Sequence, residues 1–310
     1  MCLFLRLDNI KNMSKKYFDP AICGRVRQMA LKSQKIVEGS RAGLHKSRMR
    51  GMSTTFSQHR QYVHGDDLRH LDWKVFAKTD KYFIREFEAE TNLECRIFLD
   101  CSESMFYQSE YASISKYDYA ATLATTLSFM LLKEKDSCGL ILFDDKVRTI
   151  MPPRSSHSHF LNMVETMENI TPGKNSDLNA VLLKSGSQFK KKGIAIVISD
   201  FIMDVQKLAQ GLSQLNFSGQ DVILMLVEDP AERDFPFSGQ TRFLEVEGDE
   251  KLLCDASDLR DIYLEERSAH HQGVRDIGRI FAYPLEILPT DQPLEDVLAG
   301  FLVARMGKVV

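Results

Sequence analysis

Four short apolar runs constrain the fold of this chain more than any other feature. They are RIFLD (96–100), CGLILF (138–143), IAIVIS (194–199) and DVILMLV (221–227). Runs of this length that are rich in Ile, Leu and Val are typical of parallel strands covered on both faces. Stretches with helical periodicity separate them, at 117–135, 158–169, 176–192 and 204–215. The alternation predicts an α/β fold with a doubly wound, mostly parallel sheet and helices on both faces.

The segments outside these runs have patterns of their own. A tight turn after the second run predicts an antiparallel edge strand at 146–153. The remaining predicted elements are strands at 54–63, 82–90, 242–248 and 283–288, helices at 67–79, 256–278 and 292–306, and a loop at 229–240. We therefore predict two parts. Residues 1–93 are a basic N-terminal segment with a β-rich, strand-helix-strand extension packed on the rest, and residues 94–306 form the α/β domain.

Composition places the chain among ordinary soluble proteins. Hydrophobic residues make up 44% and charged residues 27% of the 310 residues. No window approaches the roughly 20 apolar residues that cross a bilayer, so we expect no transmembrane segment and a cytoplasmic location. The six cysteines include no CxxC pair, which argues against a zinc knuckle or a disulfide framework.

The charge is unevenly distributed. Residues 1–60 hold 13 lysines and arginines against 3 acidic residues, although the whole chain has a net charge of −3. This basic arm could lie against the acidic remainder or simply be solvated. It could also bind nucleic acid, anionic lipid or an acidic partner. Between residues 5 and 55 the only aromatic residues are Tyr17 and Phe18, a pattern that disfavours base stacking.

Polar side chains gather where two predicted strands end. Asp100 ends the first run and Asp200 follows the third. Because ligands of parallel sheets bind beyond the carboxyl ends of the strands, both carboxylates face the same edge. Ser102 and Ser104 are two residues apart and can turn their hydroxyls toward one point. Ser176, in a loop that leads into a helix, can add a third hydroxyl.

Two carboxylates and three hydroxyls form an all-oxygen set. This is the hard ligand type that suits Mg²⁺, or Mn²⁺ or Ca²⁺, rather than zinc. Because few of these ligands are anionic, the metal should keep waters and an open coordination position for a carboxylate from outside. The structural alternative is that Ser102 and Ser104 cap a helix.

Enzyme chemistry is poorly supported. A phosphatase that used Asp100 as its nucleophile would need a carboxylate two residues later, where Ser102 stands. The sequence also contains no GxSxG, HExxH, GxxxxGK[ST] or GxGxxG motif. We therefore expect no catalytic residues and no small-molecule substrate.

The strand-end residues carry a first resemblance. Asp100, Ser102 and Ser104 resemble the DxSxS motif of the metal-ion-dependent adhesion site (MIDAS) in von Willebrand factor A domains. The SDF stretch at 199–201 resembles the later Asp loop of that site. KNSDL at 174–178 matches the Gly-Gly-Thr-Asp loop only in part, with Ser176 in place of Thr. The resemblance implies a Rossmann-type von Willebrand A-like fold.

A second resemblance covers most of residues 43–305. The segment 43–90 is similar to the signature of the family known as DUF58, which lies upstream of an A-like domain, and 290–305 is similar to the end of that family's proteins. The matching pattern, R-x-Y-x-x-G-D-D-x-R-x-x-D-W, is formed by Arg60, Tyr62, Gly65, Asp66, Asp67, Arg69, Asp72 and Trp73.

The second resemblance implies a non-enzymatic adaptor or chaperone-like protein. Proteins of this kind often work beside a MoxR-type AAA+ ATPase in the assembly or maturation of a client protein. The motif itself has two interpretations. As a scaffold, Asp66 or Asp67 caps a helix that begins near Leu68 and Trp73 anchors it in the core. Alternatively, the motif forms a partner surface.

Overall fold

The computed structural model describes most of the chain in several stretches. They are residues 16–20, 22, 54–62, 71–89, 93–173, 176–187, 189, 191–244 and 251–299. The chain divides into two compact units. Met1–Ala42 with Leu93–Val309 form the larger one, called the body here, and Gly43–Asn92 form the smaller one. The junction at Asn92 and Leu93 lies beside the predicted boundary, whereas Met1–Ala42 groups with the body.

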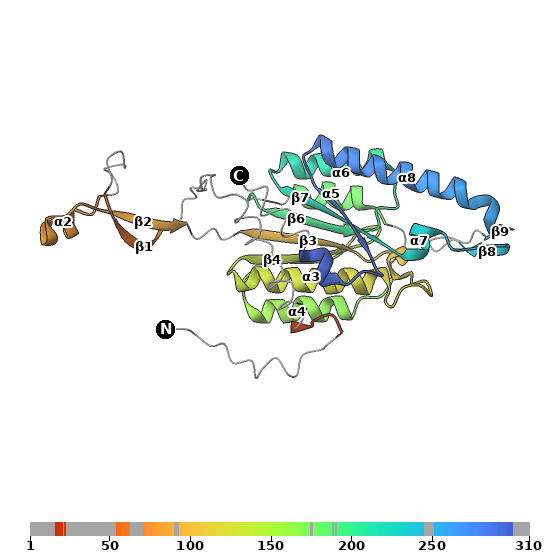
Figure 1. Cartoon of the computed structure of the whole chain (residues 1–310), viewed down its shortest axis with the longest axis horizontal. Coiled ribbons are helices and arrows are strands. Elements are labelled where there is room, and N and C mark those ends of the chain that lie inside the picture. Colours follow the sequence, from red (N-terminus) through yellow and green to blue (C-terminus); the bar gives the residue numbers. More distant parts are fainter. Residues whose placement is uncertain are drawn as a thin grey trace. The chain divides into compact units, whose positions relative to one another are not determined.

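A six-stranded sheet forms the centre of the body (Figure 1). The strands are β3 (Glu94–Asp100), β4 (Ser137–Phe143), β5 (Val147–Arg154), β6 (Ile194–Ser199), β7 (Asp221–Glu228) and β10 (Leu285–Pro289). Their order is β10-β7-β6-β3-β4-β5, and every neighbouring pair is parallel except β4 with β5. The four apolar runs are therefore the inner strands and β5 is the antiparallel edge strand, which confirms the predicted α/β fold.

Helices cover both faces of this sheet. The longer helices are α3 (Lys116–Lys133), α4 (His157–Glu168), α5 (Leu178–Gly186), α6 (Val205–Phe217) and α8 (Ala256–Ile280). Helices α3 and α4 lie on one face, and α5, α6 and α8 lie on the other (Figure 1). Of the helices in the described part of the chain, none is both long and apolar enough to cross a membrane.

The inner strands are apolar on both faces because each face packs into its own core. In β3 every residue after Glu94 is buried. Ile97 and Leu99 belong to the cluster with α3 and α4, whereas Phe98 belongs to the cluster with α5, α6 and α8. This two-sided burial is the physical reason for the unbroken apolar run in the sequence.

The segment after β7 differs from the prediction. The predicted loop at 229–240 contains a short helix, α7 (Pro230–Asp234), which begins with a capping box formed by Asp229 and Glu232. Strand β8 (Gln240–Leu244) then pairs antiparallel with β9 (Lys251–Asp255), a strand that the sequence analysis missed.

Part of the N-terminal segment packs on helices α3 and α4. Tyr17 is buried, and its hydroxyl donates to Asp118 Oδ1 of α3 over 2.7 Å. The Phe18 ring contacts Phe129 of α3 and Phe160 of α4, with centroid distances of 4.9 and 5.3 Å. These two aromatic side chains connect the segment to the face of the sheet that α3 and α4 cover.

The smaller unit contains the predicted strand-helix-strand extension. Strand β1 (Thr54–Gln61) pairs antiparallel with β2 (Phe83–Ala89), and α2 (Trp73–Thr79) lies between them in the chain. The backbone N–H of Val75 donates to Asp72 Oδ1 over 3.2 Å, so Asp72 caps α2.

The scaffold interpretation of the upstream motif made two predictions, a buried Trp73 and a helix cap at Asp66 or Asp67. Trp73 is not a core anchor: 62% of it is exposed, and it lies at the first turn of α2, where buried Leu71 and Asp72 precede it. The expectation that Trp73 is buried is therefore wrong. The proposed caps Asp66 and Asp67, and Leu68 where the helix was expected to begin, lie outside the described residues.

Trp73→Ala is expected to lower the free energy of unfolding by less than about 1 kcal/mol, because little of the ring leaves water on folding. Leu71, two residues earlier, is 2% exposed, so Leu71→Ala should cost about 2–5 kcal/mol. Urea unfolding of both variants, followed by circular dichroism, measures the contrast. Equal losses in the free energy of unfolding for the two variants would show that Trp73 is buried.

Candidate metal site at the carboxyl edge of the sheet

The ends of β3 and β6 bring Asp100 and Ser199 together. These strands are parallel neighbours, with Leu99 opposite Ile198. The residues that follow, Asp100 and Ser199, therefore lie side by side at the carboxyl edge of the sheet. The hydroxyl of Ser199 donates to Asp100 Oδ2 over 2.7 Å. Both residues are buried. The pairing register therefore fixes the position of the Asp100 carboxylate.

Asp100 is the centre of the site. Its Oδ1 accepts from the backbone N–H of Ser102 over 2.9 Å, and its Oδ2 also accepts from the hydroxyl of Ser176 over 2.9 Å. The residue has no exposed surface. Burial, followed by the negative charge of Asp200, raises the pKa of Asp100 from 3.8 to about 6. The crowding of two carboxylates therefore favours a cation or a proton at this point.

The two serines of the DxSxS motif converge as the sequence predicts. A single turn of 3₁₀ helix, η3 (Glu103–Phe106), follows β3, and the hydroxyl oxygens of Ser102 and Ser104 lie 3.2 Å apart. Both serines are buried, whereas Glu103 is exposed. Ser102 occupies the N-cap position of η3, but its side chain makes no capping hydrogen bond. The capping alternative therefore does not explain Ser102.

The loop that carries Ser176 is attached to the same edge. The backbone N–H of Gly173 donates to the Cys101 carbonyl over 2.8 Å, and that of Asp177 donates to the Asp144 carbonyl over 3.0 Å. A side chain at Gly173 would collide with Asp144, so this position requires glycine. Lys174 and Asn175 lie outside the described residues. These contacts hold Ser176 next to Asp100.

Asp200 is held by a lysine that the sequence analysis did not single out. The Nζ of Lys116, the first residue of α3, lies 3.0 Å from Asp200 Oδ2 and 2.6 Å from Glu232 Oε1 of α7. Lys116 has no exposed surface. The other oxygen of Asp200 accepts from the backbone N–H of Ile202 over 3.2 Å. Both oxygens of Asp200 thus have protein partners, so a water is the natural link between Asp200 and a cation.

The predicted site residues are therefore brought together. Asp100, Ser102, Ser104 and Ser176 form one hydrogen-bonded group, and Asp200 lies close enough to shift the pKa of Asp100. In the stretches that the structure describes, no group of three or more His, Cys, Asp or Glu side chains could hold a metal. A cation here would depend on the serine oxygens and on water, which fits Mg²⁺ better than zinc.

The upstream motif is only partly described. Tyr62 and Tyr82 form an edge-to-face pair, with centroids 6.3 Å apart, and the backbone N–H of Tyr62 donates to the Tyr82 carbonyl. Gly65, Asp66, Asp67 and Arg69 lie outside the described residues, as does the side chain of Arg60. Trp73, at the end of the motif, is exposed to solvent.

Comparison with known proteins gives relatives in two species of Mycobacterium. The uncharacterized proteins Rv1480 of Mycobacterium tuberculosis and Mb1516 of Mycobacterium bovis are each 24% identical to this chain over 292 residues. The aligned regions cover 93% of this chain and 90% of each relative.

Several solved structures are similar to the chain. An aerotolerance-related membrane protein from Bacteroides fragilis has a TM-score of 0.46 at 17% identity, over 70% of this chain and 99% of that one. BatB from Bacteroides thetaiotaomicron has a TM-score of 0.45 at 18% identity, with the same coverage. The SpRpn10 VWA domain has a TM-score of 0.39 at 12% identity, over 71% and 97%.

A family model identifies the chain more directly. The model described as "Protein of unknown function DUF58" matches residues 58–273, which is more than half of the chain. The matched range includes the whole upstream motif, from Arg60 to Trp73, and the strand-end residues Asp100, Ser102, Ser104, Ser176 and Asp200. The chain therefore belongs to the DUF58 family.

Proposed function

We propose that the body is a non-enzymatic, divalent-metal-dependent protein-binding module. Asp100, Ser102, Ser104 and Ser176 would hold Mg²⁺, and Asp200 would act through a metal-bound water. The observation that carries the proposal is the Asp100 carboxylate, which takes hydrogen bonds from Ser176 and Ser199 beside the converging hydroxyls of Ser102 and Ser104. The bound metal would supply an open coordination position for an Asp or Glu carboxylate of a partner protein.

Hydrogen bonds within the chain already orient the proposed metal ligands in the absence of a cation. Ser199 and the backbone N–H of Ser102 fix the orientation of the Asp100 carboxylate. Lys116 neutralises part of the negative charge on Asp200, so the site holds less negative charge than two free carboxylates would give. A partner carboxylate would then add negative charge to the coordination shell of the metal. Metal binding and partner binding should therefore strengthen each other.

The partner class comes from the family resemblance. We infer that the chain acts as an adaptor or co-chaperone of a MoxR-type AAA+ ATPase in the assembly or maturation of a client protein. The alternative of nucleic-acid binding has gained no support, and of residues 1–53 only 16–20 and 22 are described.

Mg²⁺ binding is expected to weaken as the pH falls below about 6, because a proton then competes for the Asp100 carboxylate. The pH dependence of the stability of the metal-free protein agrees with this expectation. A raised carboxyl pKa means that the folded state loses stability as the pH rises from about 4 to about 6, and Mg²⁺ should offset that loss. Millimolar MgCl₂ should therefore raise the melting temperature at about pH 7.5 and leave it unchanged at about pH 5. An equal rise at both pH values would contradict a metal bound through Asp100.

A further inference from the structure

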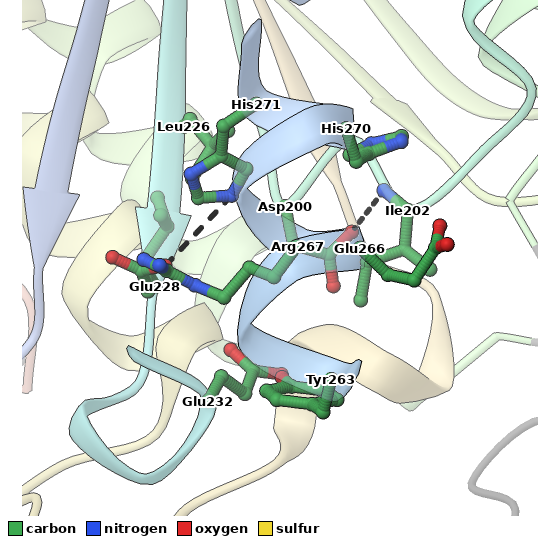
Figure 2. A pocket seen from close by; sticks show the side chains of 11 residues that line it. Asp200, Ile202, Leu226, Glu228, Glu232, Tyr263, Glu266, Arg267, His270 and His271 are labelled. Carbon is green, nitrogen blue, oxygen red and sulfur yellow. Dashed lines mark hydrogen bonds and ion pairs between the residues drawn. The ribbon is translucent and has the colours of Figure 1, made fainter. Parts of the chain in front are cut away.

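A cavity of about 330 Å³ lies beside the candidate metal site, under α8 (Figure 2). Asp200 lines it and so belongs to both. Its walls come from the carboxyl end of β7, from α7 and from the face of α8 that carries Tyr263 and His271. The volume is at the lower end of the roughly 300–1,000 Å³ of small-molecule pockets, so it suits one long side chain rather than a folded element.

The cavity combines apolar walls with carboxylates. Ile202 and Leu226 supply aliphatic surface, and Tyr263 supplies an aromatic ring. Ile202 at 60% exposure and the exposed Glu266 mark the side that faces solvent, whereas Glu228 is buried. An occupant would therefore place an aliphatic stem along one wall and a polar head among the acids.

The charges of the cavity are unbalanced. Its four carboxylates are those of Asp200, Glu228, Glu232 and Glu266. Among the described residues, two cationic side chains form ion pairs with these carboxylates. Arg267 pairs with Glu228, and the buried Lys116 is shared by Asp200 and Glu232. Two negative charges are left over, and Glu266 has no ion pair within the described part of the chain.

Two neighbouring aromatic groups, His271 and Tyr263, do not correct this imbalance. Burial, followed by the charge of Arg267, lowers the pKa of His271 to about 4, so this imidazole is neutral near pH 7. Burial raises the pKa of Tyr263 to about 12, so the phenol stays neutral as well. The Nε2 of His270 lies 2.9 Å from the Phe201 carbonyl, which only accepts, so that nitrogen carries a proton donated to the backbone.

We propose that this cavity binds a monovalent cation on an aliphatic stem, the chemistry of an arginine or lysine side chain of a partner protein. The stem would lie against Ile202 and Leu226, and the cationic head would meet Glu232, Glu266 and the Tyr263 ring. That the same partner also presents a carboxylate to the metal rests on the proposed function. Binding of the cation itself does not depend on it.

The test uses n-butylguanidinium as the probe and the full chain with ¹³C-labelled histidine rings, in EDTA. The signals of His270 and His271, assigned through the His270→Gln and His271→Gln variants, should shift and saturate. The neutral isostere n-butylurea and the anion pentanoate should shift them far less. Because EDTA removes any divalent metal, a failure here is separate from a failure of the metal site.

A matched pair of variants on α8 tests the charge. Glu266→Gln should weaken n-butylguanidinium binding about threefold, the size expected for an exposed pair, whereas Glu265→Gln should not weaken it. Glu265 is the adjacent exposed acid and does not line the cavity. The proposal is overturned if the probe shows no saturable binding, if n-butylurea or pentanoate binds as well as n-butylguanidinium, or if both variants weaken binding equally.

Discussion

Asp100→Asn is expected to abolish Mg²⁺ binding and to change the free energy of unfolding of the metal-free protein by no more than about 1 kcal/mol, because removal of a buried charge offsets the lost hydrogen bond from the backbone N–H of Ser102. The amide keeps the shape of the carboxylate, and its carbonyl oxygen can still accept from Ser176 and Ser199, but its NH₂ group then takes the place of Oδ1 and cannot accept from the backbone N–H of Ser102. The variant removes a charge that is buried beside Asp200. Loss of even an outer partner of a metal ligand costs about 10- to 100-fold in affinity, so loss of this central ligand should cost more.

Titration calorimetry with MgCl₂ and urea unfolding in EDTA measure the two effects. Asp145→Asn is the matched control, because it makes the same chemical change at the partly exposed carboxylate of the β4–β5 turn. It should bind Mg²⁺ as the wild type does. Wild-type affinity in Asp100→Asn would mean that the hydroxyl cluster is structural and holds no metal.

Lys116→Met is expected to lower the free energy of unfolding by about 3–5 kcal/mol, because removing one partner of a buried ion pair leaves an uncompensated charge. Lys116 has no exposed surface and contacts the carboxylates of Asp200 and Glu232. Burial disfavours its ammonium, but these two acids outweigh burial and hold the pKa of Lys116 above its ordinary value. The lysine is thus charged throughout the accessible pH range.

A double-variant cycle distinguishes loss of the Lys116–Glu232 ion pair from a general loss of packing. Adding Glu232→Gln to Lys116→Met should restore part of the lost stability, because it removes one of the orphaned acids. Mg²⁺ should also stabilise Lys116→Met more than it stabilises the wild type, because Asp200 then has no other cation. Additive losses in the cycle, together with an unchanged response to Mg²⁺, would show that Lys116 acts only by filling space.

The inner sheet could be predicted from the sequence because burial on both faces leaves an unbroken apolar run. The runs in β3, β4, β6 and β7 are of this kind. Strand β9 was missed because KLLCD is short and stands directly before a charged helix. Helix α7 was missed although the spacing of Asp229 and Glu232 is that of a capping box, a signal that the proline after Asp229 strengthens.

The candidate site was predictable only where a motif has fixed spacing. Ser102 and Ser104 follow a strand end at alternate positions, so their convergence could be foreseen. Lys116 gave no such signal, because a lysine at the start of a helix is normally solvated and its two partners are distant in sequence. Trp73 was misplaced because a large aromatic residue is usually buried, and here it stands at an exposed helix start.

The most direct measurement is an affinity purification from extract of the source organism in three parallel lanes. They are wild type in Mg²⁺, wild type in EDTA, and Asp100→Asn in Mg²⁺, with bound proteins identified by mass spectrometry. A metal-bridged adaptor predicts a AAA+ ATPase in the first lane and its absence from the other two. The same partners in all three lanes would contradict the metal bridge and would make the upstream motif around Trp73 the surface to test.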